Sequence, residues 1–204
     1  MPNRKDQKRI RDLCNEMVKR FGKEWGARLS QAAAYRWEAL LLTLSDYPDS
    51  FQSHLIHNIF PAIAVFDALI AEGKSREEAA RLTDEIFSAC MEEIAGGIRK
   101  LLKLPGLYRA MPKIFGTLAF KLFSPDAGFA AVLHQVKGGR ARFDMTACPY
   151  LDTCRKLGYP ELAPLFCHSD DICYGNMHPK LKWNRTKTMA RGSDCCDFDL
   201  YIKK

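Results

Sequence analysis

The chain has 204 residues, of which 47% are hydrophobic and 27% charged, and its formal net charge is +7 at pH 7. This length is sufficient for one large domain or two small ones, and the composition is that of an ordinary globular protein. The basic charge indicates an anionic partner; because no aromatic-interleaved RNA motif or zinc-finger spacing is present, we expect a small anionic ligand and no nucleic acid.

The first residues are basic and polar and lack the apolar segment of a secretory signal, so we expect a cytoplasmic protein. Thiols stay reduced in that compartment. The eight cysteines are therefore interpreted as metal ligands, catalytic thiols or small buried residues rather than as a disulfide framework. The most apolar run, residues 53–70, contains histidine, asparagine, proline and aspartate, which argues against a membrane span.

Helical spacing dominates the first half of the chain. Apolar residues recur every three or four positions over residues 10–21, and residues 28–44 continue as an alanine-rich helix. Residues 54–72 predict a strongly apolar helix that ends at Gly73, because glycine is the usual residue just beyond a helix C-terminus.

Ser75 and Glu78 form a capping box, which predicts the start of another helix. Its core stripe is predicted to consist of Leu82, Ile86, Phe87, Cys90 and Ile94. Cys14 and Cys90 both lie on apolar stripes, so we interpret them as core residues.

Residues 101–123 are amphipathic and basic, and two prolines, Pro105 and Pro112, interrupt them. We expect a broken helix that covers one edge of the core. The alternative is a segment that meets a membrane surface or forms a lid.

Strand patterns appear in the second half. The predicted strands cover residues 141–148, 181–190 and 195–202, and the predicted short helices cover residues 149–158 and 160–171. Residues 191–194 are expected to form the hairpin connection between the last two strands.

The predicted fold class is α+β, with a helical N-terminal half packed on a small, mainly antiparallel C-terminal sheet. We divide the chain into a helical region, residues 1–135, and a cysteine-rich α+β region, residues 136–204. The two regions are expected to form one compact domain together.

Six of the eight cysteines lie in the C-terminal region. Their spacing lacks the Cys-x2-Cys pairs of common structural zinc sites, but thiolates from helices and a strand end could still converge on a metal ion. Cys148, Cys154 and Cys167 are the candidate zinc ligands. If the thiols act as nucleophiles instead, no cofactor is required.

Nucleophilic catalysis needs a thiolate beside a base or a positive charge. Cys167 is followed by His168, Asp170 and Asp171 at a predicted helix end, and Cys196 is expected on the interior face of the last strand. The two carboxylates could act as general acid and base, because adjacent carboxylates split their pKa values. Packing of each cysteine as a small apolar residue is the alternative.

Candidate binding residues occur in both halves. Arg185 suits a bidentate contact with a ligand carboxylate, and otherwise it is a surface arginine on a strand. His54 and Asn58 share the apolar helix with His57 and could line a pocket, although histidine on such a helix is more often a core or rim residue.

Three stretches, residues 54–79, 143–171 and 183–198, resemble the L-2-amino-thiazoline-4-carboxylic acid hydrolase family. The resemblance runs from about residue 50 to residue 200. Its C-terminal signature consists of Cys148, residues 158–162, Cys167, Asp170, Arg185, Thr186, Thr188, Gly192 and residues 196–198.

The resemblance implies a hydrolase that opens a cyclic C–N bond in an amidine or isothiourea, converting 2-amino-thiazoline-4-carboxylate to carbamoyl-cysteine. It implies that Asp170 protonates a ring nitrogen and that a thiolate or an activated water attacks the adjacent carbon. Cys167 is preferred to Cys196 as the nucleophile. Cys195 makes a vicinal pair with Cys196, and the resemblance assigns this pair no role.

Substrate contacts follow from the same resemblance. Arg185 would pair with the substrate carboxylate, and Thr186 or Thr188 could donate hydrogen bonds.

The alternative function is a non-enzymatic small-ligand-binding or sensor domain with a cysteine-bound zinc. A weaker similarity to four-vinyl-reductase domains, some of which bind zinc through cysteines, favours this alternative. Membrane contact by residues 101–123 and formation of an oligomer are further alternatives for the partners of the chain.

Overall fold

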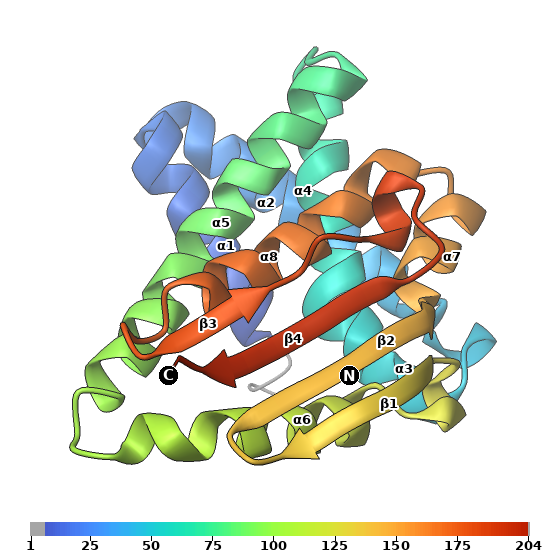
Figure 1. Ribbon diagram of the computed structural model, residues 1–204. Coiled ribbons are helices and arrows are strands. Elements are labelled where there is room, and N and C mark those ends of the chain that lie inside the picture. The colour runs from blue at the N-terminus through green and yellow to red at the C-terminus, as the bar shows by residue number, and fades with distance from the viewer. Residues whose placement is uncertain (1–6, 204) are drawn as a thin grey trace. The chain divides into compact units, whose positions relative to one another are not determined.

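The structure is a computed structural model, and residues 7–203 are described below. Over these residues the chain divides into two compact units, of which the first contains residues 7–90 and 154–165 and the second residues 91–153 and 166–203. Helices make up the N-terminal part, and an antiparallel sheet follows at the C-terminal end (Figure 1). The predicted α+β class is therefore confirmed.

Long helices build most of the first unit: α1 (Lys8–Phe21), α2 (Lys23–Leu41), α3 (Asp49–His54) and α4 (Phe60–Ala71), with a 3-10 turn at Leu44–Asp46. The amphipathic pattern of α1 buries Ile10, Leu13 and Met17, as its spacing predicts. Helix α2 begins earlier than predicted, one residue after the glycine that ends α1. The helices pack as α1 on α2 and α2 on α4.

A π-helical turn, Leu55–Ile59, joins α3 to α4. Pro61 follows it in the first turn of α4 and cannot donate a backbone hydrogen bond to the preceding turn. The wider π turn accommodates the proline ring, so the helix continues through it. The combined helix Asp49–Ala71 is long and apolar enough to span a membrane by length and composition, but 67% of its most apolar window is buried inside the protein, as in a core helix.

Helix α5 (Arg76–Leu101) starts at the predicted capping box, in which the Ser75 hydroxyl accepts a hydrogen bond from the Glu78 N–H at 3.1 Å. The predicted core stripe is buried as far as Cys90. Ile94, however, is 41% exposed, so its assignment to the core was wrong. The buried side of the helix changes after Cys90, where the second unit begins, and Ala95 is buried instead.

Within the described residues, the second unit contains a four-stranded antiparallel sheet in the order β1-β2-β4-β3 (Figure 1). Its strands are β1 (Ala130–Lys137), β2 (Arg140–Ala147), β3 (Leu181–Asn184) and β4 (Cys196–Ile202). Strand β1 was not predicted because most of its side chains are exposed and give no clear alternation. Gly138 and Gly139, both with positive φ, make the tight turn to β2, and this pair was the available hairpin signal.

The connection from β3 to β4 is longer than the four-residue hairpin predicted from residues 191–194. Strand β3 ends at Asn184, and residues 185–195 form a loop with a 3-10 turn at Met189–Arg191. The Asp197 carboxylate in β4 holds this loop by accepting hydrogen bonds from the backbone N–H groups of Thr186 and Lys187. The loop therefore folds back on the start of β4 instead of continuing the strand.

Two helices cover one face of this sheet. Helix α6 (Met111–Leu122) follows the 3-10 turn Leu107–Ala110 and packs on β1, β2 and β4. Phe115 of α6 contacts Phe143 of β2, Trp183 of β3 and Tyr174 of α8 (Ala163–Gly175). The prediction of an interrupted helix over residues 101–123 is confirmed, since α5 ends at Leu101 and Pro112 lies in the first turn of α6.

The remaining elements connect the helices and strands described above. A 3-10 turn, Pro125–Ala127, precedes β1, and helix α7 (Pro149–Lys156) follows β2. Pro149 occupies the first helical position and Gly158 takes a positive φ beyond the end of α7, as predicted. A further 3-10 turn, Pro160–Leu162, leads directly into α8.

Candidate functional site

Three cysteines of the second unit have sulfur atoms that influence one another. Cys148 lies between β2 and α7, Cys167 lies inside α8, and Cys196 begins β4. Cys167 was predicted at a helix end, and that placement was wrong, because α8 continues to Gly175. Cys195 and Cys196 are both buried at the start of the last strand.

The central contact of the site is a hydrogen bond between the side chains of Cys167 and Cys196. This bond lowers the pKa of Cys196; burial acts in the opposite direction, and the N–H of Met189, 3.2 Å from the sulfur, stabilises the thiolate further. The same bond raises the pKa of Cys167, and burial adds to this effect. The Cys167 hydrogen bond and the Met189 N–H thus both favour negative charge on the Cys196 sulfur.

Cys148 has a different environment. Its sulfur accepts backbone hydrogen bonds from Leu151 and Tyr150, the position of an N-capping group for α7. Burial nevertheless dominates and raises the pKa of Cys148 to about 11, with a small further contribution from Cys196. The neutral thiol is consistent with a capping role beside the Cys167–Cys196 pair.

Asp170 follows Cys167 by almost one turn of α8. Its side chain retains 32% exposure, yet the carboxyl group lies so deep among protein atoms that desolvation raises its pKa to about 7. Arg185 opposes this shift through an ion pair with Asp170 at 3.1 Å. The site thus contains a carboxyl group that changes protonation state near neutral pH.

Arg185 is almost fully buried, with 2% of its side chain exposed. One guanidinium nitrogen contacts Asp170, and the other donates to the Cys167 carbonyl at 2.6 Å and pairs with Asp171 at 2.7 Å. The guanidinium also lies over the Trp183 ring, 5.6 Å from its centroid. The observed partners of Arg185 belong to the protein itself, and its contact with a substrate carboxylate stays a prediction.

The two candidate threonines have contrasting environments. The Thr186 hydroxyl donates to Asp197 at 2.6 Å and belongs to the contacts that hold the loop. Thr188 is 8% exposed, and its hydroxyl oxygen has no hydrogen-bond partner among the described residues. Thr188 directly precedes Met189, whose N–H points at the Cys196 sulfur. A buried hydroxyl without a partner is costly, which makes Thr188 the better candidate for a ligand contact.

Other predicted site residues belong to the first unit. His54 ends α3 and stacks on Phe51 at 5.4 Å between ring centroids, whereas Asn58 lies in the π turn. Cys154, one of the three candidate zinc ligands, is buried in α7. Within residues 7–203, no group of three or more His, Cys, Asp or Glu side chains is arranged to hold a metal ion.

Sequence reasoning missed two contributors to the site. The backbone N–H of Met189 carries no signal in the sequence, because any residue except proline could supply it. Asp197 belonged to the family signature, and its role in holding Thr186 and Lys187 emerges only from the loop geometry. The pKa of Asp197 is lowered, because these hydrogen bonds outweigh the opposing effect of burial.

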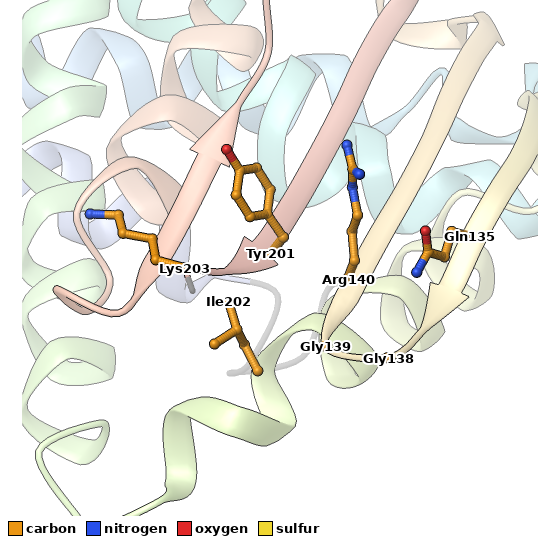
Figure 2. A pocket seen from close by; sticks show the side chains of 7 residues that line it. All are labelled: Gln135, Gly138, Gly139, Arg140, Tyr201, Ile202 and Lys203. Carbon is orange, nitrogen blue, oxygen red and sulfur yellow. The ribbon is translucent and has the colours of Figure 1, made fainter.

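A separate shallow pocket of about 470 Å³ lies at the β1–β2 turn, lined by Gln135, Gly138, Gly139, Arg140, Tyr201, Ile202 and Lys203. Figure 2 shows Arg140 and Tyr201 pointing to the same side of the sheet and Ile202 to the other. Arg140 is engaged by the Asp199 carboxylate at 2.8 and 2.6 Å. Since its cation is already paired and no thiol lines the pocket, the candidate site remains the cysteine cluster.

No curated protein matches the chain at a significant level. A family model described as L-2-amino-thiazoline-4-carboxylic acid hydrolase matches residues 52–200, which is most of the chain. The match includes Cys148, Cys167, Asp170, Arg185 and Cys196. The resemblance inferred from the sequence is thereby confirmed, and the chain belongs to the L-2-amino-thiazoline-4-carboxylic acid hydrolase family.

Proposed function

We propose that the protein hydrolyses 2-amino-thiazoline-4-carboxylate, or a close cyclic isothiourea carrying a carboxylate, to a carbamoyl-cysteine. Family membership supports a hydrolase of this type. The observation that carries the proposal is the Cys167–Cys196 thiol pair beside Asp170, a titratable carboxyl group. Nucleophilic attack on an amidine-like carbon requires two groups, a thiolate and a nearby acid.

In this proposal Cys196, rather than Cys167, is the nucleophile. The hydrogen bonds from the Cys167 thiol and the Met189 N–H favour negative charge on Cys196. Only 4% of Cys196 is exposed, so little bulk water reaches the thiolate. Cys167 then serves as the hydrogen-bond donor that positions and stabilises the thiolate.

Asp170 supplies the proton. In its neutral form it protonates a nitrogen of the substrate ring, which makes the carbon between nitrogen and sulfur more electrophilic. The Cys196 thiolate forms a C–S bond to that carbon, and collapse of the tetrahedral intermediate breaks the bond from the carbon to the protonated ring nitrogen, which leaves as the amine and opens the ring. Addition of one water molecule then expels the Cys196 thiolate and leaves the carbamoyl product, so the net reaction consumes one water.

Thr188 is assigned to substrate binding. Its buried hydroxyl has no partner among the described residues and lies next to the residue whose N–H contacts Cys196. Donation to the substrate carboxylate would satisfy this hydroxyl. Arg185 contributes indirectly: its positive charge favours the Cys196 thiolate, and its contacts orient Asp170 and the Cys167 carbonyl.

The proposal is tested by assaying hydrolysis of 2-amino-thiazoline-4-carboxylate by the wild-type protein and by Cys196→Ala and Cys195→Ala. Cys195 is the matched control because it is adjacent, buried and has a raised pKa. We expect Cys196→Ala to reduce kcat/KM at least about a thousandfold and Cys195→Ala to change it little. Equal losses in both variants, or no turnover by the wild-type protein, would contradict the proposal.

Product analysis identifies the ring bond that breaks. Opening of the C–N bond, as expected from the sequence, releases an amine, whereas opening of the C–S bond releases a thiol. Mass spectrometry of the product after alkylation of free thiols distinguishes the two outcomes.

A further inference from the structure

Helix α6 presents an uncovered aliphatic face. Ile114, Leu118 and Leu122 are spaced by four residues and are 40%, 48% and 56% exposed. The opposite side of the helix is buried, with Phe115 and Ala119 packed toward the sheet. One side of α6 is therefore anchored in the second unit while the other offers apolar surface to its surroundings.

The segment before α6 carries two further exposed leucines. Leu101 ends α5 and Leu104 lies in the following turn, and both are more than half exposed. Several exposed aliphatic side chains within one segment of the chain are unusual for a surface that meets only water. We call Leu101, Leu104, Ile114, Leu118 and Leu122, together with Lys113 and Lys121, the α6 surface.

The charge of this segment has one sign. No Asp or Glu occurs between Glu93 and Asp126, whereas this interval contains Arg99, Lys100, Lys103, Arg109, Lys113 and Lys121. Lys113 and Lys121 are exposed on α6 next to Ile114 and Leu122. Aliphatic side chains flanked by lysines, without acidic residues, are the pattern of helices that lie in the interface of an anionic membrane.

We propose that the α6 surface docks on the surface of an anionic lipid bilayer. The leucine and isoleucine side chains would enter the boundary between head groups and acyl chains, while Lys113 and Lys121 would contact lipid phosphates. A second copy of the chain fits less well, because a twofold contact through this face would bring two basic surfaces together. The inference is independent of the proposed hydrolase activity, since it uses none of its residues.

The test is co-sedimentation of the full-length protein with vesicles. Vesicles of phosphatidylcholine with phosphatidylglycerol are compared with vesicles of phosphatidylcholine alone, at low and high salt. We expect binding to the anionic vesicles that weakens as salt rises, and at least about tenfold weaker binding to the neutral ones. Equal binding to both vesicle types, or none to either, would overturn the proposal.

Two variants separate the apolar and charged contributions. The triple variant Ile114→Ser, Leu118→Ser, Leu122→Ser removes the apolar contribution, and Lys113→Glu with Lys121→Glu reverses the charge. Each is expected to weaken binding to anionic vesicles at least about tenfold. The matched controls are Leu42→Ser, at a residue 84% exposed in the first unit, and Lys23→Glu with Lys182→Glu at exposed lysines elsewhere.

Circular dichroism and thermal unfolding of every variant confirm that the fold persists, which is expected because the substituted side chains are exposed. If the controls weaken binding as much as the α6 variants, the attraction is non-specific and the proposal fails. If the wild-type protein ignores vesicles but forms a dimer that the triple variant abolishes, a second copy is the occupant instead.

Discussion

A hydrogen bond joins the side chains of Cys167 in α8 and Cys196 at the start of β4. Two thiols that share a proton ionise as a pair, and the first ionisation is easier than that of either buried thiol alone. The Met189 N–H, 3.2 Å from the Cys196 sulfur, favours negative charge on that member of the pair. A thiolate is therefore available in an interior that would otherwise keep both groups neutral.

Substitution of Cys167 by alanine should raise the pKa of Cys196. The hydrogen bond from Cys167 is the largest influence on that pKa and lowers it. Without this bond, the effect of burial, which raises the pKa, is less strongly opposed. We expect kcat/KM at neutral pH to fall about tenfold and to recover as the pH rises, because one pKa unit corresponds to a tenfold change in thiolate population.

The ultraviolet absorbance of the thiolate during pH titration measures this shift directly, independently of access by reagents. Cys14→Ala is the control, because burial raises the pKa of Cys14 to about 11 and its thiol should not contribute near neutral pH. If Cys167→Ala abolishes activity at every pH while Cys196→Ala retains it, then Cys167 is the nucleophile, as preferred from the sequence.

Asp170→Asn should change the pH dependence of turnover. The proposed mechanism needs Asp170 protonated, and burial raises its pKa to about 7, so wild-type activity should decline as the pH rises through this value. The variant should lose about a hundredfold in kcat and should lack this decline. The control is Asp171→Asn, in which the ion pair of Arg185 with Asp170 remains. If the decline in activity at high pH persists in Asp170→Asn, a group other than Asp170 causes it.

The stability of the protein should also depend on Asp170. Its pKa in the folded state, about 7, lies above the ordinary value of 3.8, so the folded state binds the proton more tightly than the unfolded state. The stabilisation is fully present below about pH 4 and is lost as the pH rises through about 7. Urea unfolding over this range should show the wild-type protein losing stability relative to Asp170→Asn, and a constant difference would refute the raised pKa.

Thr188→Val should separate stability from substrate binding. The substitution removes a buried hydroxyl without a partner, so the free energy of unfolding should stay unchanged or rise by about 1 kcal/mol. If the hydroxyl binds the substrate carboxylate, KM should rise about tenfold. Thr188→Ser keeps the hydroxyl and should restore a wild-type KM. Unchanged KM in Thr188→Val, measured with thermal unfolding on the same samples, would exclude this contact.

Local patterns were sufficient for much of the helical structure. The capping box at Ser75 and Glu78 and the glycine signals at Gly73 and Gly158 correspond to short-range hydrogen bonds and backbone angles, so neighbouring residues suffice to predict them. Strand β1 was missed because an exposed edge strand lacks the alternation that burial imposes. The β3–β4 connection was misjudged because its course depends on Asp197, beyond the turn itself.

The candidate site, too, could be predicted only in part from local sequence. Its thiols, Asp170 and Arg185 could be identified as residue types capable of the chemistry, and the family could be recognised from them. Their roles depended on partners. The contacts of the buried Arg185 guanidinium with Asp170, Asp171 and the Cys167 carbonyl could not be predicted from the sequence.

The sequence by itself determined the α+β class, the amphipathic helices and the set of reactive side chains, because periodicity and residue chemistry are properties of the chain. Only the tertiary structure decided which sulfur receives the hydrogen bonds that favour a thiolate. That choice depends on a thiol from α8 and an N–H from the β3–β4 loop reaching the Cys196 sulfur together. Hydrogen bonds and desolvation act over a few ångströms in space, so segments far apart in sequence determine the pKa.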